Sequence, residues 1–214
     1  MKKALIVHGG WDGHHPQHGA ELFGGLLRES GFEVTIRDSL DAYLDSELLG
    51  GLDLVMQHWT MGKITREQFL GLQNAVEAGC GLGGFHGGLC DAFRENADYQ
   101  FMTGGQFVAH PGNLIDYQVD VVARNHPITE GISSFKMHSE QYYMHYDPAV
   151  EVLATTTFSG EHRAETKGVV MPVVWTKTWG KGKVFFCALG HNPDDLAVPE
   201  CRKIIHRGLL WAAK

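Results

Sequence analysis

Gly84-Phe85-His86-Gly87-Gly88 follows a short strand-like run of residues and precedes a helix-like one. In α/β enzymes, glycines two residues before and two residues after a central residue mark the sharp turn called a nucleophile elbow. The glycines permit the tight turn, which pushes the central side chain out over the edge of the sheet. Here that residue is His86 rather than serine or cysteine. The sequence therefore predicts the scaffold of a covalent-catalysis enzyme whose active site runs a different chemistry.

The segments on the amino side of the elbow alternate between strand and helix. Short apolar or alternating runs indicate strands, whereas apolar residues three and four positions apart indicate helices. The expected strands are 4–7, 32–36 and 52–57, and the expected helices are 17–30, about 39–49 and 65–78. The last of these helices begins with a capping box at 65–68 and ends at Gly79. Such alternation implies βαβ units and therefore a parallel sheet covered by helices.

The carboxy-terminal half has a different pattern. Four further strands are expected there, the last two joined as an antiparallel hairpin: 117–123, 150–156, 169–175 and 184–189. Gly180-Lys181-Gly182 supplies the turn of that hairpin, and a last helix begins near Pro199. No repeat, low-complexity stretch or linker interrupts the chain. We therefore predict one α/β domain over residues 1–214, with a mostly parallel sheet and late antiparallel strands.

The composition excludes several classes of partner. The chain has 214 residues and a formal net charge of −7 with no basic run, which argues against nucleic acid or an anionic membrane as its partner. No stretch approaches membrane-spanning length. Cys80, Cys90, Cys187 and Cys201 are scattered without a CxxC pair, as expected of buried free thiols in a reducing compartment. We expect a cytoplasmic protein, and a homo-oligomer is compatible with these features.

Four of the thirteen histidines stand at the ends of expected strands. His8 ends the first strand, His58 the third, His86 the fourth and His191 the last. The carboxyl ends of parallel strands lie along one edge of a sheet, where doubly wound proteins bind ligands, so the four side chains are expected to converge on one crevice. A single histidine at a strand end is usually structural, but four on one edge favour a functional site.

Glu140 lies among histidine and aromatic residues in His138-Ser139-Glu140-Gln141-Tyr142-Tyr143. Apolar surroundings can raise the pKa of a carboxyl group and fit it for general acid or base chemistry. An exposed glutamate on a loop is the alternative. We predict His86, Glu140, His191 and His8 as the catalytic residues.

His8, His86 and His191, with or without Glu140, could instead hold zinc or another divalent ion. Zinc binds histidine nitrogens at about 2.0–2.1 Å, but its ligands must come together from separate elements. His14-His15-x-x-His18 also has a spacing that can bind metal, although loop histidines near a helix start are commonly only polar. Since no pair has a diagnostic spacing, the sequence predicts no certain cofactor, and metal-free acid/base chemistry is the default.

Aromatic residues near the strand ends indicate the kind of substrate. A sugar ring has apolar C–H faces and a polar rim, which suit aromatic faces beside converging polar groups. Any one of these rings could equally belong to the core. The expected substrate-binding residues are His58, Trp59, Trp11, Tyr142 and Gly87, with Tyr143 close by. The expected partner is therefore a small-molecule carbohydrate.

Five segments, taken in order along the chain, carry a family resemblance: 3–10 (KALIVHGG), 84–88 (GFHGG), 126–131 (HPITEG), 139–143 (SEQYY) and the blocks between 172 and 191. As a set they resemble the trehalose-utilisation (ThuA-like) family. The resemblance implies the fold of class I glutamine amidotransferases, a flavodoxin-like three-layer α/β sandwich.

In class I glutamine amidotransferases the elbow carries a cysteine that a late histidine activates. The resemblance places His86 at the elbow and matches His191 to the late histidine. No glutamyl thioester can form at His86, and Cys90 lies four residues on, in the expected helix. Glutaminase activity is therefore not expected. Ser139 stands where many relatives carry an acidic residue, whereas Glu140 remains.

The resemblance also implies a role in the catabolism of trehalose and related disaccharides, in association with dehydrogenases that make 3-keto sugars. Isomerisation, elimination or hydrolysis of a keto-disaccharide starts by removing a proton next to a carbonyl, which needs a base and a stabilised enediolate. Glu140 or His86 would be the base, with His191 and His8 stabilising charge or moving protons. Two alternatives stay open: a non-catalytic sugar-binding or regulatory protein on an inherited enzyme fold, and a metal-dependent hydrolase.

Overall fold

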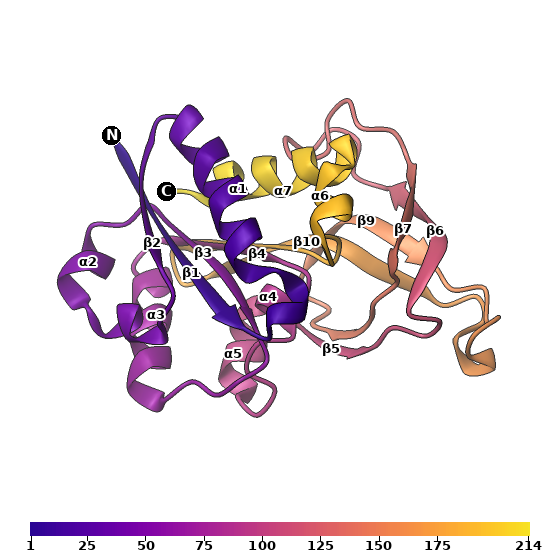
Figure 1. The fold of residues 1–214 in the computed structure, drawn as a ribbon, viewed down its shortest axis with the longest axis horizontal. Helices are drawn as coiled ribbons and strands as arrows, with labels where there is room; N and C mark the ends of the chain where they lie inside the picture. Colours follow the sequence, from indigo (N-terminus) through magenta and orange to yellow (C-terminus); the bar gives the residue numbers. More distant parts are fainter.

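A computed structural model describes residues 1–214 and arranges them in three layers, with a nine-stranded sheet in the middle (Figure 1). The strands follow the order β2-β1-β3-β4-β11-β10-β9-β6-β7. Their bounds are β1 (Lys2–Gly10), β2 (Phe32–Arg37), β3 (Leu54–Thr60), β4 (Gly81–Phe85), β6 (Leu114–Val121), β7 (Phe135–Glu140), β9 (Glu151–Thr157), β10 (Val170–Trp179) and β11 (Gly182–Cys187). Two further strands, β5 (Gly105–Ala109) and β8 (Tyr143–Tyr146), pair with each other in a small separate sheet.

The sheet confirms the predicted fold class. Neighbours in the β2-β1-β3-β4-β11 half are all parallel, and their order is the 2-1-3-4-5 order of flavodoxin-like proteins. From β11 onward the pairs β11/β10, β10/β9, β9/β6 and β6/β7 are antiparallel. The chain is therefore a flavodoxin-like sandwich extended on one side by late antiparallel strands.

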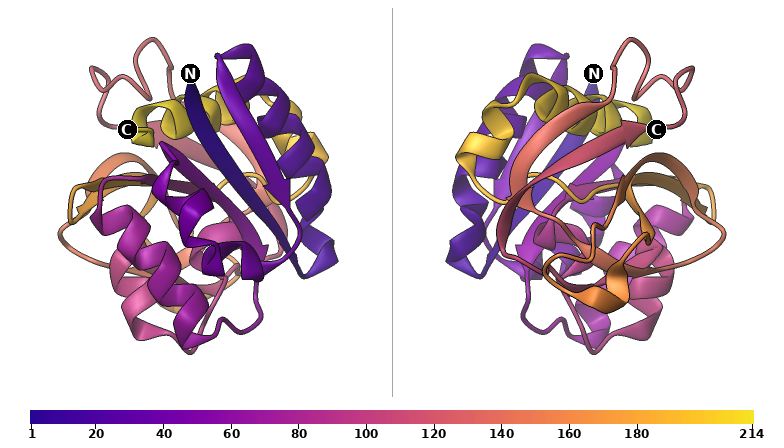
Figure 2. Two further views of the ribbon diagram at one scale, coloured as in Figure 1. Left: turned by 90° about the vertical axis from the view of Figure 1, so that its left-hand side faces the viewer. Right: turned by 90° about the vertical axis from the view of Figure 1, so that its right-hand side faces the viewer.

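Helices cover both faces of the sheet (Figures 1 and 2). In Figure 1, α1, α6 and α7 lie above the sheet, α3 and α5 lie below it, and α2 lies at its left edge. The helices are α1 (Pro16–Glu29), α2 (Ser46–Gly50), α3 (Arg66–Glu77), α4 (Gly87–Cys90), α5 (Ala97–Thr103), α6 (Pro193–Ala197) and α7 (Pro199–Ala212), with 3-10 turns η1 (Asp12–His14), η2 (Leu40–Leu44) and η3 (Ala164–Thr166).

Local signals explain where these helices begin. The capping box of α3 is present: the Thr65 hydroxyl accepts from the Gln68 N–H, and the Gln68 side chain accepts from the Thr65 N–H. The single helix expected at about 39–49 is instead divided into η2 and α2. Ser39 caps the first with its side chain and Asp45 caps the second, so each offers the chain a new helix start.

Two strands are longer than the sequence predicted. β1 continues to Gly10 and β3 continues to Thr60, so His8 and His58 lie within strands and not at their ends. The strands β5, β7 and β8 were not predicted at all, and Glu140 closes β7. These differences decide which side chains reach the carboxyl edge of the parallel strands.

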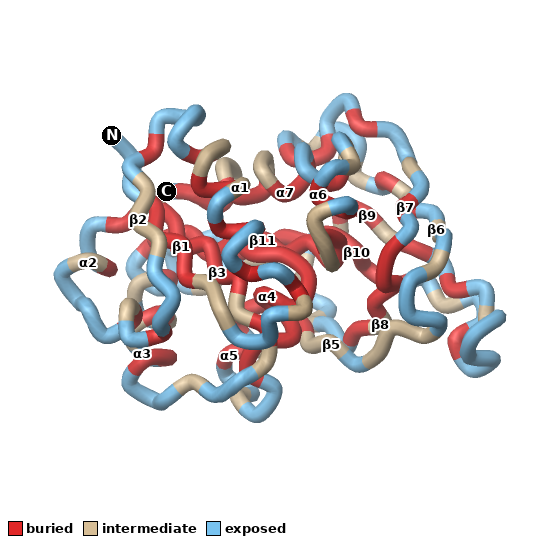
Figure 3. Tube along the Cα trace, viewed as in Figure 1, coloured by how far each residue is buried: buried red, intermediate tan, exposed pale blue.

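The core is continuous through the sheet and its covering helices. A cluster of 54 buried apolar residues fills it, and Figure 3 shows that the buried chain segments run through the central strands while the outer helix faces are exposed. All four cysteines are free and buried, as predicted. Burial raises the pKa of Cys187 to about 12, so its thiol stays protonated. None of the helices is long and apolar enough to cross a membrane.

Candidate functional site

The elbow at His86 has the strained backbone that its sequence predicts. His86 has φ 50° and ψ −144°, a conformation that residues other than glycine rarely adopt and that is commonest at functional sites. Its N–H donates to the carbonyl of Cys187 at 2.7 Å, which ties the turn to the end of β11. Two residues after His86, in α4, a Cβ at Gly88 would lie 2.2 Å from Nδ1 of His58, so only glycine fits there.

Four polar side chains meet at this edge of the sheet. His14 lies in η1 just after β1, His86 follows β4, His191 follows β11, and Glu140 closes β7. Each offers one metal-ligand atom, and the four atoms lie within 4.8 Å of one another. Three of the four follow parallel strands, where doubly wound folds bind ligands. We call these residues the His3Glu cluster.

The contacts inside the cluster centre on Nε2 of His86. This nitrogen lies 3.1 Å from Oε2 of Glu140, 2.8 Å from the hydroxyl of Tyr142 and 3.3 Å from Nδ1 of His191. Nδ1 of His191 also lies 3.3 Å from Oε2 of Glu140. The atoms of His86, His191 and Glu140 therefore form a nearly equilateral triangle.

The orientation of two imidazoles is fixed from outside the cluster. Nδ1 of His86 lies 2.8 Å from the carbonyl of Ala188, which can only accept, so Nδ1 carries the hydrogen and Nε2 is left to face the cluster. Nδ1 of His14 lies 2.9 Å from the hydroxyl of Thr60 at the end of β3, which leaves Nε2 of His14 as its free ring nitrogen.

A further layer of hydrogen bonds holds Glu140 and His191. The hydroxyl of Tyr117 donates to the backbone carbonyl of Glu140 at 3.2 Å. The buried carboxylate of Asp195 accepts from the N–H of His191 at 2.9 Å and from the hydroxyl of Ser139. Ser139, the residue at which the resemblance led us to expect an acid, thus positions the loop of His191 through Asp195.

The charges in the cluster follow from burial and mutual contact. Burial by itself would raise the pKa of Glu140, but its contacts with the imidazoles of His191 and His86 lower it well below its usual range, so the carboxylate is ionised. The hydrogen bond to Glu140 raises the pKa of His191. Burial, with the neighbouring His86, lowers the pKa of His14 to about 2, so His14 is neutral near pH 7.

Two of the histidines predicted for the site lie outside the cluster. His8 is half-buried within β1, where burial lowers its pKa and the charges of Asp38 and Glu21 partly offset this effect. His58 is 1% exposed, stacks on Phe85 at 4.3 Å between ring centroids, and has no hydrogen-bond partner on either ring nitrogen. Burial lowers the pKa of His58 to about 3. It is a neutral core histidine beneath the elbow.

The predicted aromatic residues fall in different surroundings. Tyr142 is buried, and its hydroxyl contacts His86. Trp11 is 48% exposed, and its ring lies edge-on to that of His14 at 4.8 Å. Trp59 is half-buried and packs over Gly9, where a Cβ would lie 2.6 Å from the ring. Of these three rings, only that of Trp11 is exposed, and it lies beside His14 in the cluster.

His110 is a neighbour of the cluster that sequence reasoning missed. It follows β5, and its Nε2 lies 3.6 Å from Oε1 of Glu140, the oxygen that His86 and His191 leave free. Its ring is partly exposed and stacks on Phe107 at 5.7 Å. Its sequence context, a histidine before Pro111, resembles the turn at 126–127 and gave no sign of this position.

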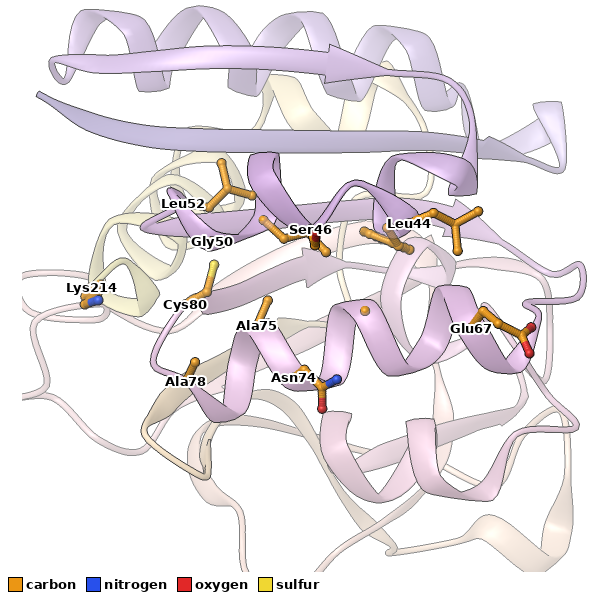
Figure 4. Close-up of a pocket in the computed structure, with 13 residues that line it drawn as sticks. Leu44, Ser46, Gly50, Leu52, Glu67, Asn74, Ala75, Ala78, Cys80 and Lys214 are labelled. Carbon is orange, nitrogen blue, oxygen red and sulfur yellow. The ribbon is translucent and has the colours of Figure 1, made fainter.

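A groove of about 360 Å³ lies away from the cluster, between η2, α2 and α3 (Figure 4). Leu52, Cys80 and Lys214 line one end of it, near the starts of β3 and β4. The cluster lies beyond the carboxyl ends of those strands, so the groove and the cluster are separate features.

Comparison with known proteins identifies one matching family and several proteins of similar fold. The sequence model of the ThuA family, described as trehalose utilisation, matches residues 3–212. A ThuA-like protein from Bacteroides uniformis superposes with a TM-score of 0.81 at 18% identity, covering 99% of this chain and 91% of the other. A ThuA-like protein from Parabacteroides merdae gives 0.81 at 18%, covering 100% and 90%.

A cytoplasmic protein, STM1381, from Salmonella typhimurium gives a TM-score of 0.68 at 15% identity, covering 100% of both chains. At these identities the structural likeness shows the fold. No curated protein matches the chain.

Proposed function

The chain belongs to the trehalose-utilisation (ThuA-like) family, and on this premise we propose that it is a cytoplasmic enzyme that processes a keto-disaccharide at the His3Glu cluster. The observation that supports this most is the meeting of His86, Glu140 and His191 at the carboxyl edge of the parallel strands. A role in sugar metabolism comes from the family. The reaction, proton removal beside a carbonyl, is the finer proposal.

Without a metal ion, the proton would pass through His191. The hydrogen bond to Glu140 raises its pKa, so the ring holds a proton more firmly than a free histidine does, and histidine is the commonest general acid or base. Because the pKa of Glu140 is lowered, its carboxylate is a weak base and serves to stabilise the imidazolium of His191. The hydroxyl of Tyr142 would then donate to the enediolate oxygen.

The surroundings of the cluster suit a sugar. Trp11 gives an exposed aromatic face beside His14, and aromatic faces stack on the C–H side of a pyranose. The partly exposed His110 faces the free oxygen of Glu140 from β5. We propose Trp11 and His110 as the residues that contact the substrate outside the cluster.

A divalent ion such as zinc is the cofactor proposed for this centre. Three imidazoles and a carboxylate are a donor set that zinc and related ions accept. When bound, such an ion supplies Lewis-acid stabilisation of a developing enediolate oxygen.

Glutaminase chemistry has no nucleophile here. His86 occupies the elbow, and the cysteine nearest to it in sequence, Cys90, is fully buried in α4. Burial raises the pKa of Cys90 well above its usual value, so no thiolate forms at the site.

The test is proton exchange on a 3-keto-disaccharide in heavy water, followed by NMR. Wild-type protein should exchange the proton next to the carbonyl, and Glu140→Gln and His191→Gln should slow this by about 10²–10⁴-fold. His8→Gln, which removes a strand histidine outside the cluster, is the matched control and should behave as wild type. Equal exchange in all four proteins would refute the proposal. Tight sugar binding with no exchange in wild type would show a non-catalytic sugar-binding protein instead.

A further inference from the structure

We infer that the His3Glu cluster is a preformed site for one late first-row divalent ion, zinc above all, held by His14, His86, Glu140 and His191. The ligand set differs from the sequence-based candidates in one residue, because His14 takes the place of His8. The inference deepens the proposed function, since it names the ion of the same centre, but it rests on the donor geometry alone.

The first argument is the spacing of the donor atoms. Two zinc ligands at 2.0–2.1 Å, separated by a tetrahedral angle, lie about 3.3–3.4 Å from each other. The measured separations among Nε2 of His86, Oε2 of Glu140 and Nδ1 of His191 are 3.1, 3.3 and 3.3 Å. An ion can therefore contact all three atoms with little movement, and His14 completes the set within 4.8 Å.

The second argument is an imbalance of donors and acceptors at His86. In the neutral ring the single hydrogen lies on Nδ1 and is donated to Ala188. Nε2 then has only a lone pair, which can accept from the hydroxyl of Tyr142 at 2.8 Å but also faces the lone pairs of the Glu140 carboxylate at 3.1 Å. A cation between these atoms turns an unfavourable contact into two bonds.

The third argument is that the imidazoles are held in the orientation that binds a metal. Metal-binding histidines usually direct their other ring nitrogen to a carbonyl, hydroxyl or carboxylate, which fixes the ring and its tautomer. Nδ1 of His86 is held by Ala188 and Nδ1 of His14 by Thr60.

The donor set selects the kind of ion. Three imidazole nitrogens and one carboxylate oxygen suit zinc, iron, nickel or copper better than magnesium or calcium, which prefer oxygen ligands. Oε2 of Glu140 is the oxygen that would bind the ion. Oε1 faces the partly exposed ring of His110 and stays free of the ion.

The test is metal binding by protein made without an affinity tag. Elemental analysis of the purified protein should find about one late first-row ion per chain. After chelator treatment, zinc titrated in competition with a chromogenic chelator should bind once. His14→Gln and His191→Gln should weaken zinc binding by more than about 100-fold, and Thr60→Val by about 10–100-fold, since loss of a partner of a ligand has that effect. His8→Gln should bind as wild type.

Cobalt substituted for zinc gives a readout that is independent of activity. Wild-type protein should show the visible absorption of a low-coordinate cobalt ion, and Thr60→Val should shift it while circular dichroism shows an unchanged fold. Absence of zinc binding by wild type, or equal binding by wild type and His14→Gln, would overturn the inference. Metal binding without proton exchange would leave the inference standing and remove the proposed reaction, whereas exchange by a wild-type protein that binds no zinc would do the reverse.

Discussion

Replacing Gly87 with alanine should displace His14 while leaving the rest of the elbow in place. A Cβ at Gly87 would lie 2.6 Å from Nδ1 and Cε1 of His14 and 2.9 Å from Cγ2 of Thr60. Ordinary contact begins near 3.4 Å, so the imidazole has to retreat by about 1 Å. Gly87 does not have a positive φ, so alanine can adopt its backbone conformation. The movement of the imidazole should therefore account for most of the effect.

The expected magnitudes separate function from stability. A misplacement of about 1 Å at a catalytic group can lower a rate by about 10²-fold, so Gly87→Ala should reduce proton exchange and zinc affinity by about that factor. Its free energy of unfolding in urea should fall by only about 1–3 kcal/mol, because a side chain can yield.

Gly88→Ala is the comparison. There a Cβ would meet both the ring of His58 at 2.2 Å and its Cα at 2.9 Å, and backbone in β3 cannot retreat. Gly88→Ala should therefore be the more destabilising of the two, with a loss of about 3 kcal/mol or more. Wild-type exchange and zinc affinity in Gly87→Ala, or a larger stability loss there than in Gly88→Ala, would refute this account of the elbow.

Three further predictions concern other positions. Gly25→Ala in α1 should raise the free energy of unfolding by about 0.5–1 kcal/mol, measured in urea, because nothing lies within 4 Å of the added Cβ. Tyr142→Phe removes a hydroxyl 2.8 Å from Nε2 of His86 and should slow keto-sugar exchange at least about 10-fold with little change in zinc affinity. A hydrogen bond from Lys177 lowers the pKa of Asp147, so its carboxylate stabilises the fold above its ordinary pKa and this stabilisation is lost as the pH falls through the lowered value. Asp147→Asn should therefore be less stable than wild type by about 1–3 kcal/mol at pH 7, with the difference vanishing in urea titrations at strongly acidic pH.

The sequence predicted the fold well because its signals were local. The capping box at Thr65, the glycine turn at 180–182 and the alternating strand–helix pattern each depend on neighbours a few residues away. The short strands β5 and β8 pair only with each other and gave no pattern long enough to recognise.

The candidate site was harder to predict because strand ends and side-chain directions depend on the whole sheet. His8 pairs with His58 in register between β1 and β3, and both strands continue two residues beyond them, so neither side chain reaches the edge. His14 reaches the edge of the sheet because it lies in η1, a three-residue turn too short to show a periodic pattern of apolar residues in the sequence. The sequence had marked 14–18 as a potential metal motif, but only the structure shows that His14 is buried while His15 and His18 are exposed.

The most direct test of a metal centre at the elbow is anomalous diffraction at the zinc edge, from crystals of untagged protein grown with zinc. The account predicts one strong peak per chain, about 2.0–2.2 Å from ring nitrogens of His14, His86 and His191 and from a carboxylate oxygen of Glu140. A map with no peak at this position, and with Glu140 hydrogen-bonded directly to His86 and His191, would contradict it.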